Sequence, residues 1–120
     1  VFDISLPIAE MDNYTTSLGP ALAAAIGEHR LFIFGHLGDG NLHVIVQVRP
    51  EDYLRLRPVI EQQVYAPLAA FQGSVSAEHG IGLEKKPYLH ISRSEVEVAL
   101  MRSLKTTLDP QGILNPGKVV

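Results

Sequence analysis

Two histidines stand on either side of a short segment with the composition of a turn. His36 and His43 are separated by six residues, four of which read Gly38-Asp39-Gly40-Asn41. An Asp-Gly pair between two apolar runs is a strong signal for a tight β-hairpin. With Asp39-Gly40 as a two-residue turn, the histidines become cross-strand neighbours whose Cβ atoms lie about 4.5–5.5 Å apart. Two imidazoles at this separation reach one metal ion, so the spacing predicts a pair of metal ligands.

A carboxylate and another histidine, Glu78 and His79, follow where a predicted short strand over residues 73–78 runs into a glycine-rich segment. Two histidines, a glutamate and open coordination positions are typical of a catalytic Zn²⁺ site, and Fe²⁺ or Mn²⁺ also use such ligands. A histidine pair without a metal is the alternative, because Gly-Asp-Gly-Asn is also ordinary turn chemistry. His29 and His90 have no partner in the sequence, and we expect them on the surface.

Composition limits the chemistry and the partners of the chain. The 120 residues include no cysteine, which excludes disulfides, Cys-ligated zinc, iron–sulfur clusters and thiol catalysis within them. A formal net charge of −3 argues against nucleic acid as a partner. No apolar run approaches the ~18–20 residues of a membrane span, and no signal peptide is evident, so we expect a cytoplasmic location. Because the chain begins without Met inside a strand, we also expect a fragment of a longer protein.

The elements that position these residues follow from the spacing of apolar side chains. Alternation predicts strands, and helical periodicity predicts three helices, the first broken or kinked at Gly19-Pro20 and the last beginning at a capping box, Ser94 to Glu97. The predicted strands are 2–8, 31–37, 42–48 and 73–78, and the predicted helices are 11–26, 51–71 and 94–108. This order predicts an α+β fold of the ferredoxin-like βαββαβ type, with helices on one face of an antiparallel sheet and an extra C-terminal helix.

Alternating side chains divide the predicted sheet into two faces. One face carries His36, His43 and Glu78 together with Phe32 and Phe34. Two phenylalanines are unusual on a face exposed only to water, so we expect another domain, a partner subunit or a cofactor to cover it, and a homodimer is one option. The helix-covered face is expected to hold Phe2, Ile4, Leu6, Ile33, Leu37, Leu42, Val44, Val46, Val75 and Ala77.

Several motifs in the chain resemble a known family. Residues 35–43 (GHLGDGNLH) and 76–82 (SAEHGIG) resemble the C-terminal part of the flavin-linked D-2-hydroxyacid dehydrogenases, which are FAD enzymes of the vanillyl-alcohol-oxidase type. This group includes D-lactate dehydrogenase, the glycolate oxidase flavin subunit and D-2-hydroxyglutarate dehydrogenase. The opening, residues 3–7 (DISLP), and the ending, residues 108–118 (LDPQGILNPGK), are similar too. The resemblance implies that residues 1–120 are one C-terminal FAD-linked oxidase domain with a ferredoxin-like core, preceded by an FAD-binding domain upstream of Val1.

The resemblance also implies roles for individual residues. His36, His43 and Glu78 match positions that bind a divalent metal, usually Zn²⁺. His79 matches the proposed active-site base, and Asn115 matches a residue close to the flavin.

One position departs from part of the family. Some members that act on diacids carry Asn two residues after the second histidine, where it helps to hold the substrate. Ile45 occupies that substrate-binding position here. This counts against a substrate like D-2-hydroxyglutarate and leaves lactate- and glycolate-like acids open, without excluding either.

The activity implied by the resemblance is oxidation of a small D-2-hydroxy acid to the 2-oxo acid. FAD would accept the hydride, the metal would orient the substrate, and an electron-transfer flavoprotein, a cytochrome or a quinone would reoxidise the flavin. The isolated chain is expected to be inactive, because it contains no flavin-binding segment. The alternative is a non-catalytic ferredoxin-like module that binds a metal or a ligand for regulation, and the sequence upstream of Val1 would distinguish the two.

Overall fold

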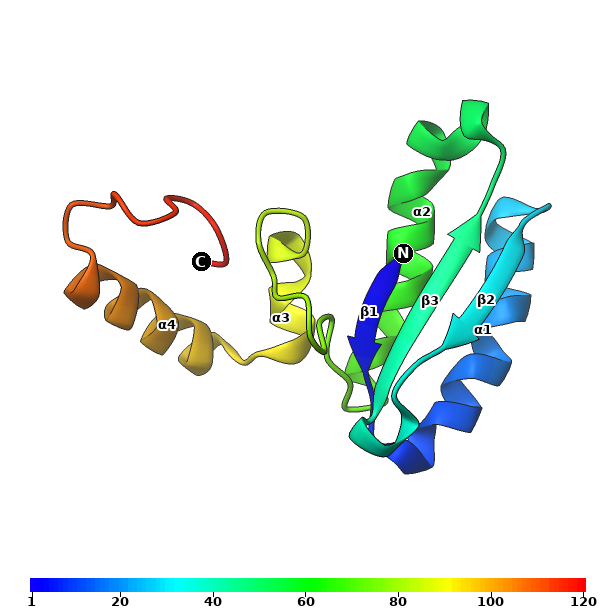
Figure 1. The fold of residues 1–120 in the computed structure, drawn as a ribbon, viewed down its shortest axis with the longest axis horizontal. Helices are drawn as coiled ribbons and strands as arrows, with labels where there is room; N and C mark the ends of the chain where they lie inside the picture. Colours follow the sequence, from blue (N-terminus) through cyan, green and yellow to red (C-terminus); the bar gives the residue numbers. More distant parts are fainter.

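Three antiparallel strands form one sheet in the order β1–β3–β2, and two long helices cover one of its faces (Figure 1). The structure is a computed structural model that describes residues 1–120. The helices and strands are β1 (Phe2–Ser5), α1 (Met11–Ile26), β2 (Arg30–Phe34), β3 (Asn41–Gln47), α2 (Tyr53–Tyr65), α3 (Leu89–Ser92) and α4 (Glu95–Leu108). Short 3₁₀ turns occupy Ile8–Glu10, Leu37–Asp39, Pro50–Asp52, Ala66–Ala69 and Lys86–Tyr88. The predicted α+β class is confirmed.

The core lies between the sheet and the two helices. Ile4 and Val44 from the sheet are fully buried, and so are Tyr14 and Leu22 from α1. The Tyr14 hydroxyl donates a hydrogen bond of 2.8 Å to the carbonyl of Val64 in α2, which ties the two helices together. Most of the side chains predicted for the helix-covered face belong to this core or pack against it. Leu37 and Ala77 are exceptions, because both lie exposed outside the strands.

Helix α1 continues through Gly19-Pro20, where the sequence predicts a break or a kink. Proline removes one backbone hydrogen bond from a helix interior, so packing must compensate for the loss. Buried Tyr14 and Leu18 anchor the segment before Pro20, and buried Leu22 anchors the segment after it. Both halves therefore pack on the same core.

The predicted fourth strand is wrong in extent. It is reduced to a single antiparallel bridge between Ser5 and Ser74 beside β1. Beyond Val75 the backbone N–H groups of residues 77–79 bond to the Asp3 carboxylate instead of to the backbone of β1. The Asp3 carboxylate thus takes the N–H groups that a longer strand would pair with the backbone of β1. Strand pairing therefore ends after the single bridge at Ser74.

The predicted hairpin register is also wrong. Strand β2 ends at Phe34, and Phe34 rather than His36 lies opposite His43. The His36 carbonyl accepts hydrogen bonds from the N–H groups of Asp39 (3.0 Å) and Asn41 (3.2 Å), which lengthens the loop. The longer loop explains why the register differs from that of a two-residue turn.

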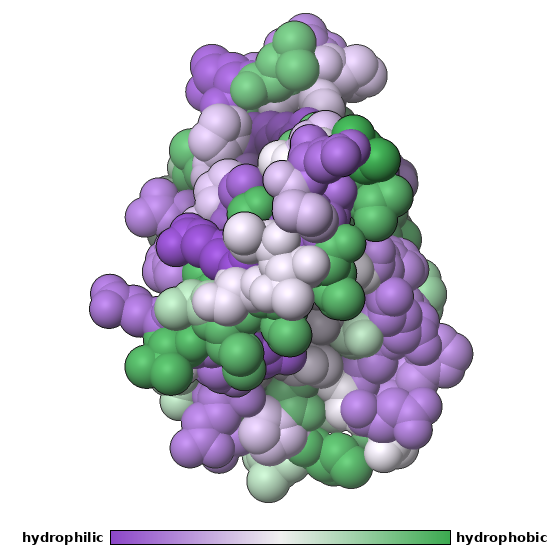
Figure 2. All heavy atoms as spheres, turned by 90° about the vertical axis from the view of Figure 1, so that its left-hand side faces the viewer, coloured by the Kyte–Doolittle hydropathy of each residue, from purple (hydrophilic) through white to green (hydrophobic).

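Helix α4 and the residues after it extend away from the sheet (Figure 1). The predicted capping box is confirmed: the Ser94 hydroxyl accepts from the Glu97 N–H, and the Glu97 carboxylate accepts from the Ser94 N–H. Hydrophobic surface appears in patches on this side of the molecule (Figure 2). The large exposed apolar side chains of α4 are Val96, Leu100, Leu104 and Leu108.

Gly40 fixes the hairpin loop against the end of β1, and a substitution there tests this role. Its φ is +72°, an added Cβ would lie 2.5 Å from the Leu6 carbonyl oxygen, and its own carbonyl accepts the Leu6 N–H at 2.8 Å. Gly40→Ala is expected to lower the free energy of unfolding by about 1–3 kcal/mol, measured by chemical denaturation.

Gly38→Ala is the matched control in the same loop, since nothing lies within 4 Å of its added Cβ and its φ is not positive. It should change the free energy of unfolding by less than about 0.5 kcal/mol. Equal losses for both variants would contradict the assigned role of Gly40.

Candidate functional site

His43 is the centre of a cluster on the sheet face that the long helices leave open. It lies on β3, with Asp3 of β1 opposite it on one side and Phe34 of β2 on the other. Its ring centroid is 5.6 Å from that of His36, nearly at right angles, and 5.9 Å from that of His79, nearly parallel. Three of the five histidines of the chain therefore meet at one place.

The structure brings together the two histidines and the glutamate that the sequence singles out. One ligand atom each from His36, His43 and Glu78 lies within 4.8 Å of the other two. His36 and Glu78 are exposed and His43 is half-buried, so the group opens to solvent on one side. Imidazole nitrogens and a carboxylate oxygen with free space beside them fit a divalent cation that also binds substrate. The donor set therefore fits the metal that the resemblance implies.

His79 stands beside this group through its ring and through its backbone. Its ring stacks near that of His43, while its N–H donates a 2.9 Å hydrogen bond to the Asp3 carboxylate. The His79 side chain is exposed, so a small molecule in contact with the cluster reaches it without displacing the core. The arrangement places a potential proton acceptor next to the metal-ligand group.

Asp3 is a site residue that is not among those predicted from the sequence. Its side chain is buried, and Oδ2 accepts three backbone hydrogen bonds, from Ala77 (3.1 Å), Glu78 (2.8 Å) and His79 (2.9 Å). These bonds attach the loop that carries Glu78 and His79 to β1. The available signal is that Asp3 is the only charged residue of the predicted strand over residues 2–8 and falls on the same face as the histidines.

Lys85 provides the positive charge nearest to this carboxylate. Its ammonium group donates to the backbone carbonyl of Asp3 and to the Ser76 hydroxyl, at 3.1 Å each, and lies 3.9 Å from Asp3 Oδ2. Burial acts to raise the pKa of Asp3, but the N–H donors of His79 and Glu78 and the positive fields of His79 and Lys85 outweigh it. The pKa of Asp3 is therefore held below its ordinary value, and the group is ionised at neutral pH.

The two remaining predicted site residues, Ile45 and Asn115, differ in how close they lie to the histidine cluster. Ile45 is on the same face of β3 as His43, opposite Phe32 of β2, and is half-buried. Asn115, with a φ of +47°, lines a pocket between α4 and the C-terminal segment that contains none of the clustered histidines. Ile45 therefore borders the cluster, whereas Asn115 does not belong to it.

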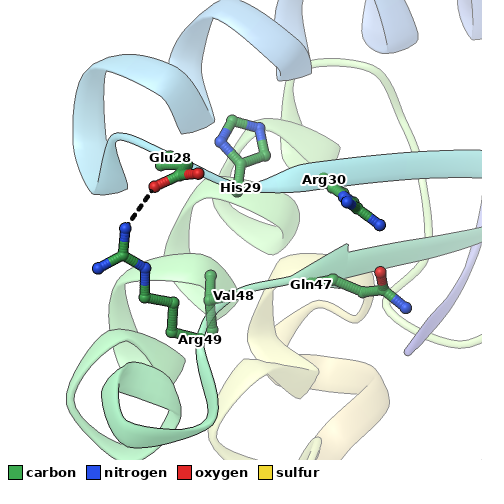
Figure 3. Close-up of a pocket in the computed structure, with 6 residues that line it drawn as sticks. All are labelled: Glu28, His29, Arg30, Gln47, Val48 and Arg49. Atoms are coloured by element: carbon green, nitrogen blue, oxygen red, sulfur yellow. Dashed lines mark hydrogen bonds and ion pairs between the residues drawn. The ribbon is translucent and has the colours of Figure 1, made fainter.

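A separate pocket lies where β2 begins and β3 ends (Figure 3). His29 lies here, and its Nδ1 is 2.7 Å from the carbonyl oxygen of Gly27. The charge of Arg49 is paired with Glu28 at 2.7 Å. His29 is thus separate from the histidine cluster, and His90 is exposed at α3.

Comparison with known protein families matches residues 1–119 to the family described as "FAD linked oxidases, C-terminal domain". The chain belongs to this family. The match leaves out only Val120, so the histidine cluster lies within an FAD-linked oxidase C-terminal domain. The family predicted from the sequence motifs is therefore confirmed.

Curated relatives of this FAD-linked oxidase domain are much longer than the chain itself. A D-2-hydroxyglutarate dehydrogenase of Xanthomonas citri is 41% identical over 98% of this chain and 26% of its own length. The mitochondrial D-2-hydroxyglutarate dehydrogenase of Rattus norvegicus is 43% identical over 99% of this chain and 22% of its own length. A D-2-hydroxyglutarate–pyruvate transhydrogenase of Saccharomyces cerevisiae is 38% identical over 99% of this chain and 25% of its own length. The chain thus spans about a quarter of these relatives.

None of the helices in the domain combines the length and the apolarity that crossing a membrane requires. The rat relative is named as a mitochondrial protein. The cytoplasmic location expected from the sequence remains a prediction.

Proposed function

We propose that the chain is the substrate-side domain of a flavin-dependent dehydrogenase that oxidises a D-2-hydroxy acid to the 2-oxo acid. The observation that carries this proposal is the convergence of His36, His43 and Glu78 beside His79 on an open face of the sheet. Membership of the FAD-linked oxidase family supports it, and so do the names of the relatives. The same membership favours an enzyme over the regulatory module.

His36, His43 and Glu78 would hold a divalent cation, and two imidazoles with one carboxylate suit Zn²⁺. When bound, such a cation lowers the pKa of a coordinated hydroxyl group and polarises its oxygen. His43 would reach the cation from β3, His36 from the hairpin loop and Glu78 from the segment after Val75. Their task is to present nitrogen and oxygen donors on one side and leave the other side open for substrate.

His79 is the residue proposed to take the proton. The substrate hydroxyl gives its proton to a ring nitrogen of His79, the C–O bond becomes a carbonyl, and the Cα hydrogen leaves with its electron pair as hydride. FAD, bound by the remainder of the longer protein, supplies the acceptor for that hydride. The Asp3 hydrogen bond to the His79 N–H holds the backbone of this base in place.

The outer face also offers apolar surface beside the cluster. Phe32 and Phe34 of β2 are 47% and 54% exposed, next to half-buried Ile45 and His43. We propose that the flavin-bearing part of the protein covers them and excludes water from the reacting atoms. The electron acceptor is expected to be an electron-transfer flavoprotein, a cytochrome or a quinone, and the homodimer remains a prediction.

Removal of either cluster histidine tests the metal site. His36→Ala and His43→Ala in the full-length protein are expected to abolish stoichiometric metal, measured by elemental analysis, because each deletes one donor of three. Turnover of D-2-hydroxyglutarate and D-lactate should fall with the metal content. The control is His90→Ala, an exposed histidine at α3, which should keep both. Full metal and full turnover in both cluster variants would remove the metal from the mechanism.

His79→Asn separates the base from the metal ligands. The variant is expected to keep its metal and its flavin absorbance, since the His79 N–H that binds Asp3 belongs to the backbone. Its kcat should fall by about 10²–10⁴-fold, the usual contribution of a positioned base. Oxidation at the parent rate with metal and flavin retained would exclude His79 as the base.

Ile45→Asn tests how the site chooses its substrate. An amide at this position can donate a hydrogen bond to a second carboxylate, whereas Ile45 offers only apolar contact. The ratio of kcat/KM for D-2-hydroxyglutarate to that for D-lactate should rise by about tenfold or more in Ile45→Asn, the value of one charge-assisted hydrogen bond. Ile45→Leu is the apolar control and should leave the ratio within about threefold. An unchanged ratio in Ile45→Asn would place substrate recognition elsewhere.

A further inference from the structure

The two carboxylate oxygens of Asp3 have different surroundings. Oδ2 accepts hydrogen bonds from the three backbone N–H groups of residues 77–79 and from the Ser76 hydroxyl at 3.5 Å. Oδ1 is buried and has no hydrogen-bond partner. The nitrogen facing it is Nδ1 of His43, at 3.7 Å. A buried carboxylate oxygen without a donor is unfavourable, so this unfilled position identifies an interaction that the site is built to make.

We propose that Asp3 is a positioning residue that sets both halves of the site. Through Oδ2 it fixes the backbone of Glu78 and His79. Through Oδ1 it holds His43 in the tautomer that carries its proton on Nδ1, which leaves Nε2 with the free lone pair. The inference rests on the proposed function, because a metal ion binds the ring nitrogen that carries the lone pair, which Asp3 would make Nε2.

The tautomer of a neutral histidine is set by what its other ring nitrogen meets. An ionised carboxylate only accepts hydrogen bonds, so next to Asp3 the Nδ1 atom of His43 must be the donor. The 3.7 Å separation exceeds a hydrogen bond, which has its optimum near 2.9–3.0 Å, and a movement of under about 1 Å closes it. The same movement satisfies Oδ1 and orients the ring.

Lys85 lies near Oδ2 of Asp3, the oxygen that faces away from His43. Its ammonium group approaches Oδ2 and the backbone carbonyl of Asp3, and no contact joins it to Oδ1. It therefore supports the attachment of the loop and the ionised state of Asp3, while Oδ1 is the Asp3 oxygen that faces the His43 ring. The two functions of Asp3 are thus separable by experiment.

Asp3→Asn separates them, because the amide keeps the shape and one carbonyl oxygen. That oxygen can still accept the N–H groups of residues 77–79, whereas the amide nitrogen now faces His43 Nδ1 and donates to it. The proton of His43 then moves to Nε2 and blocks the metal. In the full-length protein we expect hydrogen exchange of the amides of residues 77–79 to stay within about threefold of the parent. Zn²⁺ affinity, measured by competition with a chelator, should fall by about 10–100-fold.

Two further variants bracket this result. Asp3→Ala removes both oxygens, so the affinity for Zn²⁺ and the exchange protection of residues 77–79 should be lost together. Asp12→Asn makes the same chemical change on the exposed surface of α1 and should leave both unchanged. Parent affinity for Zn²⁺ in Asp3→Asn would overturn the tautomer role. If the Asp3 variants lose Zn²⁺ affinity only to the extent that the amides of residues 77–79 lose exchange protection, Asp3 has a structural role alone.

The tautomer itself can be read without zinc. In metal-free, ¹⁵N-histidine-labelled protein, the His43 signals are assigned from a His43→Ala spectrum. The parent should show Nδ1 protonated and Nε2 unprotonated, and Asp3→Asn should show the reverse. The opposite pattern in the parent would overturn the inference. A parent protein that binds no Zn²⁺ yet shows the expected tautomer would overturn the metal site proposed above and leave the role of Asp3 standing.

Discussion

The buried carboxylate of Asp3 is the interaction on which the remainder of the site depends. A charge removed from water is stable only when donors surround it. Three of those donors are backbone N–H groups 74 to 76 positions later in the chain, and a fourth is the Ser76 hydroxyl at 3.5 Å. The ammonium group of Lys85 lies 3.9 Å from the carboxylate as an ion pair. The same backbone carries Glu78 and His79. The hydrogen bonds that stabilise the Asp3 carboxylate on β1 therefore also fix the positions of these two proposed site residues.

The hairpin shows how a prediction can place residues correctly with the wrong local structure. The histidine spacing predicts proximity through a two-residue turn, yet the real loop is longer and His43 lies opposite Phe34. The proximity survives because the apolar alternation of Leu42 and Val44 already decides which face His43 occupies. His36 then approaches from the loop rather than from a strand. Face assignment depends on local alternation, whereas register depends on hydrogen bonds within the loop that the sequence pattern does not encode.

The failures share a physical cause, which is competition from distant partners. Residues 73–78 alternate well enough for a strand, but the acceptor on Asp3 captures their N–H groups. At Gly19-Pro20, where a break or a kink is predicted, the structure excludes the break, because Tyr14 and Leu22 pack on one core and α1 continues through Pro20. Where the signal is local and no distant partner competes, as at the Ser94–Glu97 capping box, prediction and structure agree.

The attachment of residues 77–79 to β1 also has a consequence for the order of events as the chain folds. The contact between Asp3 and residues 77–79 closes a loop of more than seventy residues. The loss of chain entropy is larger than for a local hairpin, so we expect this contact to form late in folding. His36 and His43 are only seven residues apart and meet through the local β2–β3 hairpin. The acid on β1 meets its backbone donors only when residues 77–79 reach it. The proposed ligand set of His36, His43 and Glu78 is therefore complete only after this long-range contact has formed.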